Sequence, residues 1–200
     1  MTTAFAAYQT ATHKMRHLTT VDRGIREENL NALLRRWTHA QQGYMDDAKV
    51  MQRWFPGQRE LMCILSAISI EQCEELADCS LPLFTLRLPA GLNEACYKPA
   101  DATSGFEKEA YEEVFIALMT RLDGLRTQPD SMPMLYDMGN TLANSLGRLS
   151  TRQLLSLSSD PSVHLAPAVT DEYFVLSAVE KLNGRERTVL ASTTRRQRLM

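Results

Sequence analysis

The part of the chain that most constrains its fold runs from Trp54 to Leu88, where helical spacing, a helix cap and a terminal strand form a unit that recurs downstream. The second copy runs from Met132 to Pro167 and lies at a constant offset from the first. The aligned pairs are Leu61 and Leu142, Leu65 and Leu146, Ser69 and Ser150, Gln72 and Gln153, Leu76 and Leu157, and Ile68 with Leu149. Two copies are fewer than a solenoid needs, so the pattern predicts an internal pseudo-dimer in which each unit covers the apolar face of the other.

Composition places the chain among globular proteins. Its 200 residues are 44% hydrophobic and 23% charged, which is typical of one or two small domains. No apolar run approaches the roughly 20 residues needed to cross a bilayer. The first 20 residues lack a basic opening followed by a hydrophobic stretch, as a secretory signal would have. We therefore expect a cytoplasmic protein that does not enter the membrane.

Charge is distributed unevenly along the chain, although the formal net charge is only −2. Residues 1–60 carry nine Lys or Arg against six Asp or Glu, residues 61–140 carry five against 13, and residues 141–200 carry eight against five. The two ends are therefore basic and the middle is acidic. Basic ends are a weak indication of contact with nucleic acid, because terminal arginines are usually solvated.

Catalytic and metal motifs are missing from the sequence. The four cysteines, Cys63, Cys73, Cys79 and Cys96, form no Cys-x-x-Cys pair and are predicted to be buried free thiols. His13 and His17 lie four residues apart without nearby acidic or cysteine partners, which favours a surface pair over a metal site. No glycine-rich phosphate loop, Gly-x-Ser-x-Gly elbow or His-Glu-x-x-His helix occurs. We expect a protein that is not an enzyme and that uses no metal or cofactor.

Apolar residues recur at intervals of three and four along most of the chain, so the predicted fold class is mainly α. The first helix, Glu27–Gln42, is predicted to bury Leu30, Leu33, Leu34 and Trp37 and to expose Arg26, Arg35 and Arg36. Further helices are expected at Asp46–Trp54, Arg59–Ser66, a Ser69-capped segment through Ala77, Glu107–Leu125, Met134–Leu146, a Ser150-capped Thr151–Ser158 and Asp171–Leu182, which would bury Phe174, Val175, Ala178 and Val179 before Asn183-Gly184 ends it.

Two short segments are predicted as strands, and each closes one of the repeated units. Leu83–Leu88 is rich in β-prone residues and lies between Pro82 and Pro89, which suits an edge strand. Val163–Leu165 is the weaker counterpart in the second copy. A turn-rich linker, Pro89–Gly105, follows the first strand. Each unit is therefore expected to end in a short strand that is followed by a helix.

The repeated unit resembles the D subunit of the bacterial flagellar master transcription activator, FlhD. The resemblance rests on a helix ending in a Leu-rich stretch, a Ser cap, Gln three residues later, Leu-Ala-Asp, and a strand ending in Leu-Arg-Leu. In the first copy the residues that carry it are Leu65, Ala67, Ile68, Ser69, Gln72, Leu76, Ala77, Asp78, Leu86, Arg87 and Leu88. In the second copy Ala143–Ser150 is similar, but its strand lacks the arginine and contains Pro167. Uncharacterised proteins of pathogenicity islands and integrative conjugative elements contain similar units.

The resemblance implies a helical regulatory subunit that joins a zinc-bearing C-type partner and helps to place the hetero-oligomer on promoter DNA. It leads us to expect partner contacts at Phe84, Leu86, Arg87, Leu146 and Leu149. Contacts with DNA phosphates are predicted for the basic face and the basic C-terminal end, through Arg35, Arg36, Arg185, Arg187, Arg195, Arg196 and Arg198. The duplicated chain would then replace a homodimer of single-copy D subunits.

The predicted domain organisation has four parts. Residues 1–45 form an N-terminal helical extension, 46–126 the first FlhD-like unit, 127–184 the second, and 185–200 a basic C-terminal tail. Residues 184–190 match the opening of a LuxR-type DNA-binding domain, but the ten residues that remain after Leu190 are too few to complete one.

We therefore expect a homo-oligomeric or hetero-oligomeric regulator of flagellar or mobile-element transfer promoters. The alternatives are an accessory scaffold of a mobile element, acting in replication or conjugation without direct DNA binding, and an enzyme with an unmatched motif.

Overall fold

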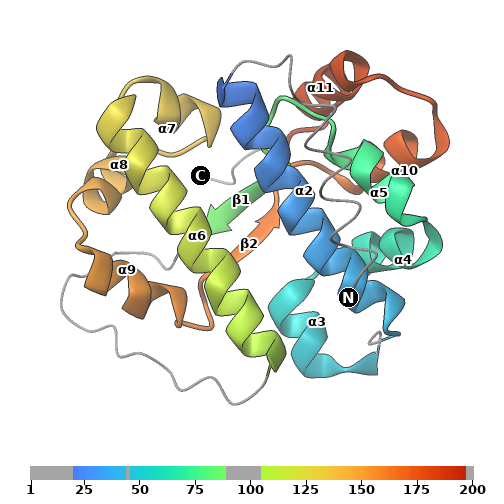
Figure 1. The fold of residues 1–200 in the computed structure, drawn as a ribbon, viewed down its shortest axis with the longest axis horizontal. Coiled ribbons are helices and arrows are strands. Elements are labelled where there is room, and N and C mark those ends of the chain that lie inside the picture. Colours follow the sequence, from blue (N-terminus) through green and yellow to red (C-terminus); the bar gives the residue numbers. More distant parts are fainter. Residues whose placement is uncertain (1–19, 44–45, 89–104, 197–200) are drawn as a thin grey trace. The chain divides into compact units, whose positions relative to one another are not determined.

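The computed structural model describes residues 20–43, 46–88 and 105–196 (Figure 1). Within them the chain is mainly helical, as predicted. The elements in chain order are α2 (Thr20–Gln41), α3 (Ala48–Trp54), α4 (Arg59–Ala67), α5 (Ile70–Ala77), β1 (Phe84–Arg87), α6 (Gly105–Thr127), α7 (Ser131–Leu135), α8 (Asn140–Gly147), α9 (Thr151–Ser158), β2 (His164–Pro167), α10 (Asp171–Val179) and α11 (Gly184–Thr193). The predictions for His13, His17, Cys96, Arg198 and most of the linker fall outside the described residues.

The chain divides into two compact units. Unit 1 comprises the residues up to Phe84 together with those from Pro167 onward, and unit 2 comprises Thr85–Ala166. The boundary falls in the strands β1 and β2, which pair in a two-stranded antiparallel sheet (Figure 1). Both strands were predicted from the sequence. The four predicted segments, with boundaries at residues 45, 126 and 184, were defined from the sequence repeat and stay a prediction.

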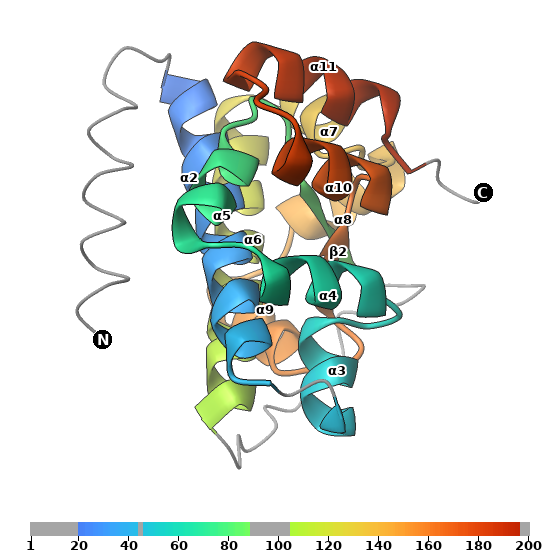
Figure 2. The same cartoon turned by 90° about the vertical axis from the view of Figure 1, so that its right-hand side faces the viewer.

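Unit 1 is built around α2, which packs against α4 and α5, and α10 packs on the same two helices and on α11 (Figure 2). Leu61, Met62 and Leu65 of α4 are buried, as predicted. The predicted faces of α2 are partly wrong, because its buried side includes Arg26, Asn29 and Arg36 as well as leucines. Leu34 and Trp37 lie only half-buried at its edge. A buried arginine carries a long apolar stem, so charge alone did not identify the outer face.

Unit 2 is built around α6, which packs against α7, α8 and α9. Its core comes from α6, α8, α9, the turn between α8 and α9, and the residue before β2, namely Val114, Leu118, Leu122, Leu146, Leu149, Leu154, Leu157 and Val163. On α6 the core residues Val114, Leu118 and Leu122 recur at intervals of four, so they form a single stripe along the helix. The predicted helix Met134–Leu146 is two helices, α7 and α8, and Asp137 between them adopts a φ of 50°.

In the part of the chain that the structure describes, three helices begin with a capping box. Ser69 and Ser150 accept hydrogen bonds from the amides of Gln72 and Gln153, and each glutamine side chain accepts from the amide of its serine in return. Both serine caps were predicted. Asn183 forms a third box with Glu186 and begins α11. The prediction that Asn183-Gly184 ends a helix is therefore wrong, because asparagine with glutamate three residues later starts a helix here.

The buried face of α10 also differs from the prediction. Tyr173, Phe174 and Ser177 point into unit 1, whereas Val175 is 45% exposed and Val179 is 76% exposed. The two valines are four residues apart and so lie on one face of the helix. The sequence pattern placed that face inward because it weighed the valines as core residues and overlooked Tyr173.

Candidate functional site at the C-terminal helix

In unit 1, the helix α11 meets α2 and the end of α5 through a cluster of polar side chains. Arg26 of α2 forms an ion pair with Asp78 and donates from Nη2 to the Ser80 hydroxyl oxygen at 3.0 Å. Arg187 of α11 lies on the other side, with Nη2 3.4 Å from Glu75 Oε2 and Nη1 4.0 Å from Asp78 Oδ2. The carboxylate of Asp78 therefore lies between two guanidinium groups that come from helices far apart in the sequence.

The two arginines of this cluster are much more buried than its acids. Arg26 and Arg187 are buried, whereas the side chains of Glu75 and Asp78 are about half exposed. Burial lowers the pKa of the Arg26 guanidinium below its usual value, although the pKa of an arginine is too high for the charge to be lost. Buried cations are stable only when they are paired. The two carboxylates therefore stabilise the docked position of α11.

Gly184, the first residue of α11, packs directly against this ion pair. A Cβ atom built there would lie 2.6 Å from Asp78 Oδ2 and 2.9 Å from Arg26 Nη1. Both distances are far below van der Waals contact. Glycine at this position therefore lets the start of α11 approach the paired charges.

The segment between α5 and β1, residues 78–83, carries the other polar contacts. Asn29 of α2 holds this segment by donating to the Cys79 and Leu81 carbonyl oxygens at 3.2 and 2.9 Å and by accepting from the Leu83 amide at 2.8 Å. From the same segment the Ser80 amide donates to the Thr188 hydroxyl at 3.0 Å. These bonds fix the segment between α2 and α11.

The thiol of Cys79 is buried beneath α11, where it donates to the Arg187 carbonyl oxygen at 3.9 Å. Burial raises the pKa of this thiol. Cys73 in α5 is buried too, and burial raises its pKa to about 12. Both thiols are free, as predicted, but Cys63 is exposed, contrary to the prediction. The two buried thiols are therefore neutral and unreactive at neutral pH.

The far end of α11 is attached by backbone hydrogen bonds. Val169 and Arg195 form an antiparallel bridge, and the Arg196 amide donates to the Ala168 carbonyl oxygen at 2.8 Å. The Arg196 side chain donates from Nε to the Val169 carbonyl oxygen at 2.9 Å and lies 3.5 Å from Asp171. Residues 185–196 are thus an ordered part of unit 1, although the sequence predicted a basic tail.

The predicted partner-binding residues mostly lie in the interior. Phe84 is buried in unit 1, and Leu146 and Leu149 belong to the core of unit 2, where Leu86 packs against the same cluster. Arg87 at the end of β1 is exposed. Of these five residues, Arg87 is therefore the one placed for contact with another molecule.

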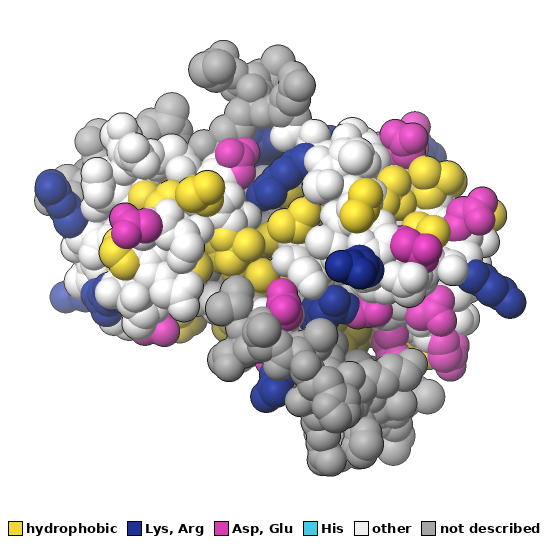
Figure 3. Space-filling view, turned by 90° about the horizontal axis from the view of Figure 1, so that it is seen from above, with side chains coloured by type: hydrophobic (Ala, Val, Ile, Leu, Met, Phe, Trp, Pro, Cys, Tyr) yellow, Lys and Arg dark blue, Asp and Glu magenta, His cyan; other side chains and the backbone are white. Residues whose placement is uncertain are grey.

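The predicted DNA-binding arginines separate in the structure. Arg36 is 1% exposed, and its guanidinium lies 5.5 Å from the Trp54 ring centroid and 4.5 Å from that of Phe84. Arg187 is 3% exposed in the cluster described above. Neither side chain can reach a phosphate in this conformation. Arg185 and Arg196 are exposed, and Arg35 and Arg195 are half-buried. On the face seen in Figure 3, the basic side chains drawn in colour are scattered and form no continuous surface.

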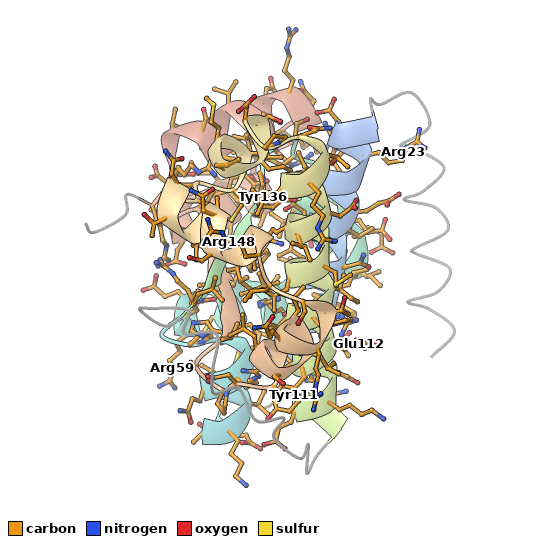
Figure 4. All side chains as sticks on the ribbon, turned by 90° about the vertical axis from the view of Figure 1, so that its left-hand side faces the viewer. Arg23, Arg59, Tyr111, Glu112, Tyr136 and Arg148 are labelled. Atoms are coloured by element: carbon orange, nitrogen blue, oxygen red, sulfur yellow. The ribbon has the colours of Figure 1, made fainter. Side chains whose placement is uncertain are left out.

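Sequence reasoning missed a pair of matching buried arginines. Arg36 in α2 donates from Nη1 to the Ala32 carbonyl oxygen at 3.0 Å, and Arg121 in α6 donates to the Ala117 carbonyl oxygen at 2.9 Å. Arg121 is 1% exposed, with its guanidinium 4.2 Å from the centroid of Tyr136, which is labelled in Figure 4. The signal was an Ala-Leu-x-x-Arg string present at residues 32–36 and again 85 positions later at 117–121.

Comparison with known proteins gives no relative: no family model matches, and neither the curated proteins nor the solved structures contain a match. Among residues 20–43, 46–88 and 105–196, no helix is long and apolar enough to cross a membrane. The same residues contain no group of three or more His, Cys, Asp or Glu that could hold a metal ion.

Proposed function

We propose that this chain is an FlhD-like subunit of a cytoplasmic transcription regulator that is not an enzyme and works through protein contacts with a C-type partner. The observation that carries the proposal is that the same order of elements occurs twice with the same local features. Each series has a long helix with a buried Ala-Leu-x-x-Arg string, a short helix, two further helices of which the second begins with a Ser–Gln capping box, and a strand.

The double series supports a duplicated D-type module. We infer that the first copy begins at α2 and the second at α6, because the long helices match at Ala32 and Ala117, Leu33 and Leu118, and Arg36 and Arg121, all 85 positions apart. In this proposal one chain supplies the two modules that a homodimer of single-copy subunits would supply. The assembly would then be a hetero-oligomer of this chain with its partner.

Arg87 is the residue we assign to partner contact. Its side chain is exposed, whereas the strand residues before it are buried or half-buried. We expect Arg87→Ala to weaken binding of the partner without unfolding the chain. Arg126→Ala is a suitable control, because it removes one exposed positive charge from the same unit.

The test is a pulldown of tagged full-length protein from its native host at moderate salt, with mass spectrometry of bound proteins and sequencing of bound DNA. Recovery of a C-type regulator together with a discrete promoter supports the proposal. Loss of that recovery for Arg87→Ala, but not for Arg126→Ala, supports the assigned contact. Equal recovery with both variants would remove Arg87 from the interface.

A scaffold of a mobile element, without direct DNA contact, is the second candidate. It is favoured by the burial of Arg36 and Arg187, which removes two of the predicted phosphate contacts. In the same pulldown, this function predicts replication or transfer proteins and no specific DNA.

A further inference from the structure

The helix α11 is attached to unit 1 mainly by polar contacts. Its fully buried side chains are Arg187 and Ala191, and Leu190 is half-buried. By contrast, α10 inserts the rings of Tyr173 and Phe174 into the core. Burial of one methyl group and part of one leucine contributes on the order of 2 kcal/mol, so the hydrophobic effect alone holds α11 weakly. Backbone hydrogen bonds at Arg195 and Arg196 hold the far end of the helix, and the pairing of Arg187 with Glu75 and Asp78 holds its first half.

We propose that Glu75 and Asp78 form an autoinhibitory contact: by pairing with Arg187 they keep it from binding nucleic-acid phosphates. A nucleic-acid backbone then releases α11 by competing with the two carboxylates for the arginines of this segment. The inference rests on the proposed regulatory function and adds a control element to it. In the docked state Arg187 is buried and paired, whereas Arg185 is exposed. Full release also breaks the bonds that Arg195 and Arg196 make with Ala168, Val169 and Asp171. Arg185, Arg187, Arg195 and Arg196 then become available together on one segment.

The charges explain why a polyanion is the competing ligand. Each carboxylate offers a single negative charge on a half-exposed side chain, where solvent and salt partly screen its attraction for Arg187. A nucleic-acid backbone offers closely spaced phosphates and gains further free energy by releasing condensed counterions. Arginine also forms bidentate hydrogen bonds with phosphate. A short cationic segment therefore gains more from the backbone than Arg187 gains from Glu75 and Asp78.

Release of α11 can be followed through Cys79. Its thiol lies under the helix and donates to the Arg187 carbonyl oxygen, so release exposes it and returns its raised pKa toward the ordinary value. Cys73 lies within α5 and is buried as well. Labelling of Cys79 without labelling of Cys73 therefore reports movement of α11, whereas labelling of both reports unfolding of unit 1.

Binding and release must be linked in both directions. If duplex DNA binds the released state better, DNA must raise the released population, and any change that favours release must tighten DNA binding by the same factor. Coupling of this kind is usually between about 5-fold and 150-fold. We expect an effect of about tenfold for removal of the two carboxylates.

The experiment uses the full chain carrying Cys63→Ser and Cys96→Ser, with a thiol reagent, mass spectrometry of Cys73 and Cys79, and mixed-sequence duplex DNA. The test variant is Glu75→Gln with Asp78→Asn. The control is Glu172→Gln with Glu180→Gln, which changes the net charge equally in unit 1 at two exposed side chains. Arg187→Gln is the second test variant. It removes the same ion pairs, but it also removes an arginine that would bind phosphate, so it separates release of α11 from DNA binding.

We expect DNA to accelerate labelling of Cys79, but not of Cys73, in the parent chain. The Glu75/Asp78 variant should label about tenfold faster without DNA and bind DNA about tenfold tighter, while the control changes neither. Arg187→Gln should label faster without tighter binding. The proposal is overturned if DNA binds without changing Cys79 labelling, or if faster labelling brings no gain in DNA affinity. It is also overturned if the control variant labels as fast and binds DNA as tightly as the Glu75/Asp78 variant, or if no variant binds DNA. Absence of DNA binding would overturn this inference without contradicting the proposed partner-dependent function.

Discussion

Unit 1 and unit 2 contain the same kinds of helix but satisfy the carbonyl groups at the helix ends differently. In unit 1 the carbonyl oxygen of Leu76, near the end of α5, accepts a hydrogen bond from the Tyr173 hydroxyl of α10 at 2.8 Å. In unit 2 the carbonyl oxygen of the matching residue, Leu157, accepts from the Asp160 amide at 3.2 Å, within its own turn. The carbonyl oxygen near the end of α5 is therefore satisfied by a distant part of the chain, whereas the one near the end of α9 is satisfied locally.

This difference shows how one sequence pattern supports two kinds of module. Unit 2 spans one continuous stretch of chain, whereas unit 1 contains the C-terminal residues from Pro167 onward. The stability of unit 1 should therefore depend on α10 and α11. Substitutions at matching positions test this dependence, because hydrogen exchange reports the two units separately.

The largest effect is expected for Tyr173→Ala, which removes a fully buried ring and the hydrogen bond to Leu76. We expect unit 1 to lose about 4 kcal/mol, as is usual when a buried aromatic side chain is truncated. Hydrogen exchange should show faster exchange of amides in α4 and α5, with α8 and α9 unchanged. Tyr173→Phe keeps the ring and should cost about 1–2 kcal/mol. Equal loss of protection in both units would show that the C-terminal segment does not stabilise unit 1 alone.

The matched arginines come next, compared as Arg36→Ala and Arg121→Ala. Arg36 lies over the rings of Trp54 and Phe84, and Arg121 lies over the ring of Tyr136. Each such contact contributes about 0.5–2 kcal/mol to a buried cation. We expect a loss of about 3 kcal/mol in unit 1 for Arg36→Ala and about 2 kcal/mol in unit 2 for Arg121→Ala. Urea unfolding followed by hydrogen exchange measures both. A larger loss for Arg121→Ala than for Arg36→Ala would contradict the expected order.

The sequence predicted local features of the fold better than the distant contacts. Both serine caps and both strands follow from residues adjacent in the chain, and both were predicted. The burial of Arg36 was not predicted, because it depends on Trp54 and Phe84, which come from other elements. A charged residue is assigned to the surface unless the rings that cover it are known.

The candidate site was predicted less well, for a related reason. The arginines near the C-terminus were recognised, but α11 was taken for a tail because Asn183-Gly184 has the composition of a helix stop. Glu186 three residues after Asn183 was the missed signal of a helix start. The pairing of Arg187 with Glu75 and Asp78 joins residues more than 100 positions apart, and no local pattern encodes it.

The two capping boxes should respond alike, because their geometry is local. Ser69→Ala and Ser150→Ala each remove the hydroxyl that accepts from the third helical amide, at 3.3 and 3.4 Å. Loss of a serine cap costs about 1 kcal/mol. Each substitution should lower the stability of its own unit by this amount, and thermal unfolding of the single and double variants should show additive effects. Marked non-additivity would show that the two capped helices, α5 and α9, are coupled energetically.

The smallest effects, and opposite signs, are expected for two glycines. A Cβ at Gly147, the last residue of α8, would meet nothing within 4 Å, so Gly147→Ala should stabilise unit 2 by about 0.5 kcal/mol through the lower entropy of the unfolded chain. A Cβ at Gly184 would displace the carboxylate of Asp78 from between Arg26 and Arg187. The side chain of Asp78 is half exposed and can move, which limits the cost of Gly184→Ala to about 1 kcal/mol. Thermal unfolding gives the two signs, and labelling of Cys79 should rise for Gly184→Ala alone. Stabilisation by both substitutions would mean that α11 does not need its close approach to the ion pair.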